Sequence, residues 1–264
     1  METIKELRKI CQRPDCTQRS VSIYFTKLLL YTKISPNQVT FIDDIFGISG
    51  AFLFFVSSNW AFVIGGILLQ FFEIFDCVDG EIARYLKVKG VLNRSIAEEN
   101  RTEFLQDIIH PILHPLMFLG LGFGLFRLYP NLLILILSFA AALGMSLDTY
   151  VNVLREKILG ASGLQASRVY KQMNDGAKGF ASKIPLGKQI LEFIVFLTPV
   201  PGVITLLMVA PILDMILLPS PIYIMGFPLD FKIAVLILYA IVQQFLWILN
   251  ARFSVKSIVD NYEH

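Results

Sequence analysis

The sequence predicts an all-α, polytopic membrane protein with six transmembrane helices and an amphipathic interfacial segment at its N-terminus. Of its 264 residues, 55% are hydrophobic and only 17% are charged, whereas soluble domains carry roughly 25% charged residues. Six stretches are apolar over nearly the length that a helix needs to cross a bilayer, about 20 residues. This composition excludes a disordered chain and disfavours an ordinary soluble domain. A net charge of only +2 predicts no nucleic-acid partner.

The expected elements follow in chain order. Residues 1–39 form a cytoplasmic leader, in which residues 20–33 mix apolar and basic positions, as helices on a membrane surface do. A break at Ser35-Pro36 precedes the first crossing, because proline holds the residue before it in extended geometry. Asp43 and Asp44 are interpreted as charges near a helix N-terminus, where the dipole favours carboxylates. The six expected crossings are residues 40–56, 60–75, 110–126, 132–151, 190–213 and 231–249, within a membrane domain over 40–253 and before a tail over 254–264.

The distribution of basic residues predicts the orientation. The leader, the connections after the second and fourth crossings, and the tail are all rich in Lys and Arg. These four regions fall on one side of a six-crossing chain, and the opposite side offers only Arg127 and Lys232. By the positive-inside rule, both termini are expected in the cytoplasm. The expected location is the cell (inner) membrane.

The chemistry is concentrated in the run DCVDGEIAR, residues 76–84, where the second crossing leaves the membrane. Asp76 and Asp79 stand three residues apart and share a helix face. Carboxylates near membrane depth are costly unless they are paired, solvated or bound to a cation. Gly80 and Ala83 are small enough to admit a flat group, and Arg84 could bind a phosphate through two nitrogens. The set suits a divalent cation with a diphosphate across it, although a lone D-x2-D is more often a helix end with scattered charges.

This run resembles the first half of the signature of the CDP-alcohol phosphatidyltransferase family, D-x2-D-G-x2-A-R-x8-G-x3-D-x3-D. Residues 35–40, SPNQVT, are similar to the P-N-x-x-T element that the family carries before its first crossing. Members of the family are described as six-helix membrane enzymes. They transfer a phospho-alcohol group from a CDP-linked donor to an alcohol and release CMP.

The resemblance implies an enzyme of phospholipid biosynthesis that uses Mg²⁺ or Mn²⁺, a CDP-linked lipid donor, expected to be CDP-diacylglycerol, and an alcohol acceptor. It also suggests a homodimer. Asp76 and Asp79 would bind the metal. The residues expected to make room for or contact the cytidine and the diphosphate are Gly80, Ala83, Arg84, Asn37 and Thr40.

The second half of the signature departs from the family pattern, and two registers are possible. One pairs Glu103 with Asp107; the other pairs Gln106 with His110. All four residues fall on one helical face, so helix geometry does not choose between the registers. In the family, the first three acidic residues bind metal and the last is the general base. Glu103 or Asp107 would then complete the metal shell, and the base would be Asp107 or His110, an imidazole being suited to accept a proton at neutral pH.

Two other functions are weighed against this one. The altered second pair could belong to a catalytically inactive relative that serves as a membrane scaffold. Intramembrane carboxylates also occur in transporters and channels, but a transporter leaves the Gly80, Ala83 and Arg84 spacing unexplained.

Overall fold

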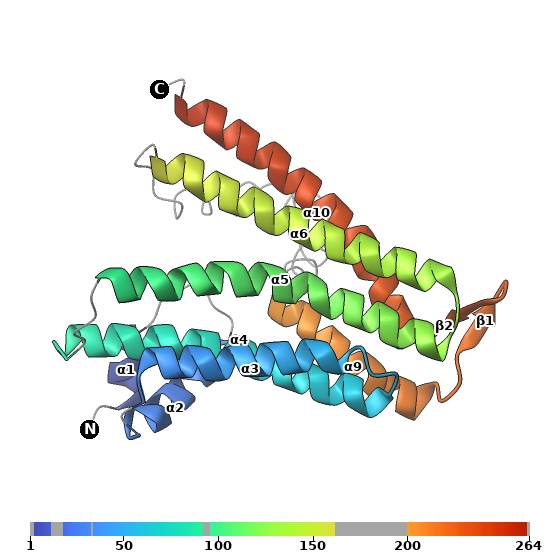
Figure 1. Cartoon of the computed structure of the whole chain (residues 1–264), viewed down its shortest axis with the longest axis horizontal. Helices are drawn as coiled ribbons and strands as arrows, with labels where there is room; N and C mark the ends of the chain where they lie inside the picture. The colour runs from blue at the N-terminus through green and yellow to red at the C-terminus, as the bar shows by residue number, and fades with distance from the viewer. Residues whose placement is uncertain (1–2, 12–17, 33, 92–95, 162–199, 263–264) are drawn as a thin grey trace, which may run out of the picture.

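The computed structural model describes residues 3–11, 18–32, 34–91, 96–161 and 200–262. Over these residues the fold consists of eight helices and one short β-hairpin, so the predicted all-α class is confirmed (Figure 1). The elements are α1 (Ile4–Cys11), α2 (Arg19–Leu30), α3 (Pro36–Leu53), α4 (Asn59–Val88), α5 (Ile96–Leu128), α6 (Leu132–Ala161), α9 (Val200–Leu217), β1 (Ile222–Ile224), β2 (Phe227–Leu229) and α10 (Phe231–Tyr262).

Four of the described helices are long and apolar enough to cross a membrane. These spans are Asn59–Val88, Ile108–Leu128, Leu132–Arg155 and Phe231–Lys256, and they contain the second, third, fourth and sixth predicted crossings. An integral, multi-pass protein is therefore supported. The first predicted crossing is α3, whose first half is polar and acidic. The fifth coincides with the shorter apolar helix Gly202–Leu217, and its residues 190–199 lie outside the described part of the chain. Six crossings therefore stay a prediction.

Helix α3 begins where the sequence places a break. The hydroxyl of Ser35 accepts a hydrogen bond from the backbone N–H of Gln38 at 3.3 Å, and the Gln38 side chain accepts one from the Ser35 N–H at 2.9 Å. This reciprocal capping box satisfies two amide groups that a helix start leaves open. Pro36 occupies the first helical position, where no N–H is needed. The first helix is therefore fixed from Pro36 onward, four residues before the predicted crossing.

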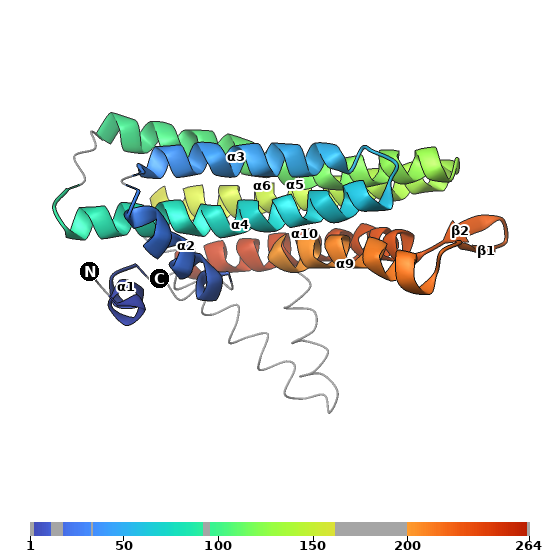
Figure 2. The same ribbon diagram turned by 90° about the horizontal axis from the view of Figure 1, so that it is seen from below.

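Small residues let α3 approach α4 and α5 closely. A Cβ on Gly50 would lie 2.9 Å from the carbonyl oxygen of Gly65, and a Cβ on Gly65 would lie 2.9 Å from that of Gly50. The backbones of α3 and α4 therefore meet almost directly at this level. Helix α3 runs alongside α4 and also packs against α5 (Figures 1 and 2). On the opposite face of α3, Phe41, Ile45, Ile48 and Phe52 form an exposed apolar stripe.

The C-terminal half packs on this three-helix group. Helix α10 runs beside α6, and α9 lies against α4 (Figure 2). The antiparallel strands β1 and β2 join α9 to α10, with Ile224 opposite Phe227 at the turn. The turn residues Met225 and Gly226 adopt positive φ values of 53° and 81°, a conformation that glycine accepts without strain. Helices α1 and α2 lie near the second half of α4, at the end of the molecule that carries the DCVDGEIAR run.

Candidate functional site

The two motif carboxylates lie in the second half of α4. Asp79 is 7% exposed, and its Oδ2 accepts a hydrogen bond from the hydroxyl of Thr40 on α3 at 2.6 Å. Thr40 also donates to the carbonyl of Pro36, 3.2 Å away, as helical threonines commonly do. The sequence resemblance implied that Thr40 contacts the cytidine; in the structure its hydroxyl orients Asp79.

Asp76, one of the two motif carboxylates, belongs to a group of three side chains that converge from three helices. Asp43 on α3, Asp76 on α4 and His110 on α5 each offer a ligand atom, and the three atoms all lie within 4.8 Å of one another. The His110 Nε2 is 3.6 Å from the Asp76 Oδ1. Two carboxylates and one imidazole form a donor set that divalent metals accept in proteins. The residues present therefore fit a metal ion.

The surroundings of Asp43 are unusual for a carboxylate. Its side chain is fully buried, and among the described residues neither carboxylate oxygen has a hydrogen-bond partner. Buried polar groups in native structures nearly always find a partner. Asp43 therefore marks a place where a group outside the described residues is expected to interact.

A glycine one turn after Asp43 on α3 sets how closely α3 approaches α4 and α5. Gly47 follows Asp43 by four residues, and a Cβ there would lie 2.5 Å from Leu113 Cδ2 and 2.8 Å from Phe72 Cδ2. Phe72 precedes Asp76 by one turn, and Leu113 follows His110 by nearly one turn. The Phe72 ring also packs on the imidazole of His110, with the ring centroids 4.9 Å apart. The close contact at Gly47 therefore fixes the spacing of the helices that carry Asp43, Asp76 and His110.

We expect Gly47→Val to lower the thermal unfolding midpoint of the purified protein, because its added methyl groups would force α3 away from α4 and α5. Overpacking of this kind costs about 1–3 kcal/mol. Ser49→Val, at an exposed position on the same helix, is the matched control. Equal midpoints for the two variants would contradict the close approach at Gly47.

Two further residues of the run bind the N-terminal helices to α4. Glu81 is fully buried, and its carboxylate oxygens accept hydrogen bonds from Ser22 at 2.9 Å and from Thr26 at 2.5 Å, both on α2. Arg84 donates through Nε to the backbone carbonyl of Cys11, at the end of α1, at 2.8 Å. The DCVDGEIAR run therefore joins α1 and α2 to α4, in addition to providing residues of the candidate site.

The expected substrate contacts are placed as follows. A Cβ on Gly80 would lie 3.1 Å from Arg84 Nη1, so the space beside this glycine holds the Arg84 guanidinium. Ala83 is half-buried on the same helix. Asn37 is exposed and lines an open pocket with Thr32 and Phe41 among others.

The alternatives for the second acidic pair are only partly described. Residues 103, 106 and 107 lie in α5, but the side chains of Glu103, Gln106 and Asp107 are outside the described part of the structure. Of the two registers, the structure describes only the side chain of His110. The neighbouring His114 faces Glu73 instead, with Nε2 3.8 Å from Oε1.

The sequence interpretation missed Asp43. The sequence analysis expected the first crossing to begin near Thr40, which puts Asp43 in the first turn of the helix. At that position the helix dipole is enough to explain a carboxylate. The observed helix begins at Pro36, so Asp43 lies two turns inside it. The signal that could have found it is the capping box, because S-P-N-Q already fixes the helix start.

Together, the fold and the site define a multi-helix membrane protein with a candidate metal centre where α3, α4 and α5 meet. Residues 33–91 match the model of the CDP-alcohol phosphatidyltransferase family. The resemblance predicted from the sequence is thus confirmed over this segment, which contains both the P-N-x-x-T element and the D-x2-D-G-x2-A-R run. The matched family is one of metal-dependent transferases. No curated protein matches the chain.

Proposed function

We propose that this protein catalyses the metal-dependent transfer of a phospho-alcohol group from a CDP-linked donor to an alcohol acceptor, with release of CMP. The proposed donor is CDP-diacylglycerol, which places the reaction in phospholipid biosynthesis. One observation carries the proposal: the segment that matches the transferase family holds Asp76 and Asp79, and Asp76 lies with Asp43 and His110 in a group that could bind a metal.

We assign Asp76 and Asp79 to the ion, Mg²⁺ or Mn²⁺, and Arg84 to the donor diphosphate. A bound ion would neutralise the diphosphate and stabilise the charge that develops on the departing CMP. Thr40 holds the Asp79 carboxylate in place through its 2.6 Å hydrogen bond. Arg84 donates to Cys11 through Nε, and we propose that its guanidinium group also binds a phosphate of the donor.

In the proposed reaction, the acceptor hydroxyl oxygen attacks the phosphorus that carries the alcohol of the donor. A new P–O bond forms, and the bond from that phosphorus to the bridging oxygen breaks and leaves its electron pair on CMP. The hydroxyl proton passes to a base on α5, for which the sequence offers Asp107 and His110.

The position of the site favours a donor with one end in lipid and the other in water. Glu81 anchors α2 beside the motif, and α2 leaves Tyr24 and Leu28 exposed. Exposed apolar side chains on a short basic helix are typical of an interfacial position. We therefore place this end of the molecule, and both termini, at the cytoplasmic face of the membrane. Acyl chains would enter from the bilayer while the nucleotide stays in water.

The direct test uses the full-length protein in lipid nanodiscs with CDP-diacylglycerol. Glycerol phosphate, inositol phosphate or serine is added as acceptor, and both CMP and the lipid product are measured by mass. We expect CMP release with at least one acceptor in Mg²⁺ or Mn²⁺, and its loss on addition of EDTA. A parallel arm offers a soluble CDP-alcohol with diacylglycerol, which tests the reversed arrangement of donor and acceptor. No CMP in any arm would count against the proposal and favour an inactive scaffold.

A further inference from the structure

We propose that Asp43, on the first helix of the matched segment and outside its D-x2-D-G-x2-A-R run, is a metal ligand. Together with Asp76 and His110 it forms a three-helix Asp–Asp–His site. The inference deepens the proposed function, on which it rests for the role of the ion. It assigns as ligands Asp43, which lies outside the signature, and His110, which one register of the signature makes a candidate base.

The first argument is the burial of Asp43. A carboxylate removed from water is strongly destabilised unless a cation or hydrogen-bond donors compensate it. Asp43 is fully buried, and among the described residues no donor reaches either of its oxygens and no Lys or Arg pairs with it. The hydroxyl that lies one turn before it, that of Thr40, donates to Asp79. A bound cation at this place would compensate the charge.

The second argument is the geometry of the three ligand atoms. Two ligands on one Mg²⁺-sized ion, each about 2.1 Å from it, can be separated by at most about 4.2 Å. His110 Nε2 and Asp76 Oδ1 are 3.6 Å apart, and all three atoms fall within 4.8 Å. Small side-chain rotations therefore suffice to bring them onto one ion. The Gly47 contact one turn below keeps the three helices at that spacing.

The third argument concerns the altered second half of the signature. In the Gln106/His110 register, a carboxylate is missing from α5. Asp43 would supply a carboxylate from α3 to the group that it forms with Asp76 and His110. His110 then acts as a ligand through Nε2 and leaves the base role to another residue. Because a nitrogen ligand suits Mn²⁺ better than Mg²⁺, which prefers oxygen, this site is expected to prefer Mn²⁺.

The test measures binding of Mn²⁺ alone by the full-length protein in nanodiscs, from the electron spin resonance signal of the free ion. The wild type should show a tight site, and Asp43→Asn should weaken it roughly 10–100-fold, as losses around metal sites do. Asp44→Asn is the matched control, because Asp44 is the adjacent carboxylate and is not in the metal-binding group. Unchanged affinity in Asp43→Asn would overturn the proposal.

A second measurement begins with the unmodified protein, so its first result does not depend on the folding of any variant. Electron spin echo modulation should show nitrogen coupled to the bound Mn²⁺. The coupling should disappear in His110→Gln and persist in His114→Gln, whose histidine faces Glu73. Absence of nitrogen modulation in the wild type would overturn the assignment of His110.

The two proposals can fail separately. Mn²⁺ binding that depends on Asp43, without CMP release in any arm of the assay above, would uphold the site and refute the function. CMP release together with wild-type Mn²⁺ affinity in Asp43→Asn would refute the site and leave the function standing.

Discussion

Asp79→Asn is expected to lower the rate of CMP release by about 10²–10³-fold or more, the cost of removing one electrostatic group from an active site. Asparagine has the same shape as aspartate and can still accept the hydrogen bond from the Thr40 hydroxyl. The fold should therefore persist while the negative charge is lost. Without that charge, a divalent ion would be held less tightly against the donor diphosphate. The measurement is CMP release at saturating donor, with the unfolding midpoint determined on the same sample.

Two companion variants make this prediction specific. Glu73→Gln removes a carboxylate nearly two turns before Asp79 on the same helix, where it faces His114. It should leave CMP release within about threefold of wild type, since Glu73 contacts no proposed ligand. Thr40→Val removes the hydroxyl that bonds Asp79 and the Pro36 carbonyl, and we expect the loss of this orienting partner of Asp79 to lower CMP release about 10–100-fold. Equal rates for Asp79→Asn and Glu73→Gln would show that the motif carboxylate has no catalytic role.

Local chemistry explains why most helices could be predicted from the sequence. Crossings two, three, four and six are long apolar runs, and length with composition is enough to identify such runs. Helix α3 is harder, because its polar first half hides a helix that the capping box at Ser35 fixes. The small hairpin β1–β2 was not predicted, because its three-residue strands carry too short a pattern to detect.

The site was only half predictable, because its residues come from three helices. Asp76 and Asp79 lie three residues apart on one helix, so a linear motif reveals them. Asp43 lies 33 positions before Asp76 (76 − 43), and only the packing of α3 on α4 brings them together. That packing depends on close contacts at glycines, which sequence periodicity does not encode. Glu81 was likewise unassigned, because its partners on α2 are more than 50 residues away.

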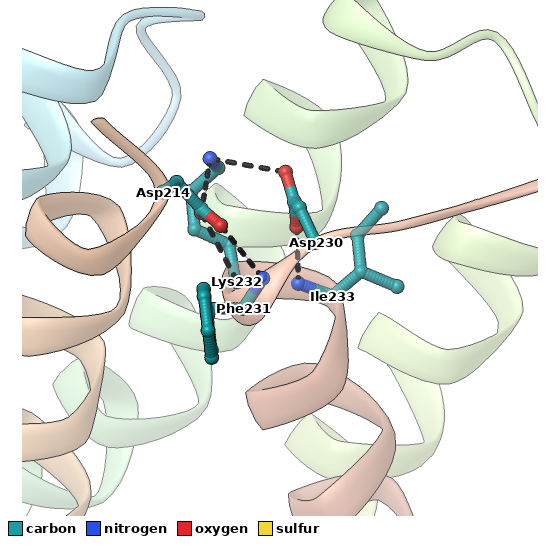
Figure 3. Close-up of polar contacts among 5 residues, drawn as sticks. All are labelled: Asp214, Asp230, Phe231, Lys232 and Ile233. Atoms are coloured by element: carbon teal, nitrogen blue, oxygen red, sulfur yellow. Dashed lines mark hydrogen bonds and ion pairs between the residues drawn. The ribbon is translucent and has the colours of Figure 1, made fainter. Parts of the chain in front are cut away.

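At the opposite end of the molecule, Lys232→Met is expected to destabilise the protein by about 3–5 kcal/mol, the cost of breaking a buried ion pair from one side. Lys232 on α10 is 2% exposed; its Nζ donates to Asp214 Oδ2 and is 3.0 Å from Asp230 Oδ2 (Figure 3). Asp214, near the end of α9, also accepts the backbone N–H of Phe231 at 2.7 Å. Asp230 accepts that of Ile233 at 2.8 Å and so caps α10.

Methionine fills the volume of the lysine stem but leaves two buried carboxylates without their cation. Burial and the neighbouring Asp230 carboxylate raise the pKa of Tyr129 to about 12, so this phenol stays neutral and adds no further negative charge to the cluster. Lys256→Met, at an exposed position on the same helix, serves as the control, and the unfolding free energy in mild detergent is the measurement.

The triple variant with Asp214→Asn and Asp230→Asn should recover part of the loss, because it removes the uncompensated charges. A Lys232→Met effect no larger than that of Lys256→Met would show that the cluster does not join α9 to α10. The same burial explains how a lysine can lie on the side of the predicted topology that is otherwise almost without basic residues: its charge is neutralised within the protein.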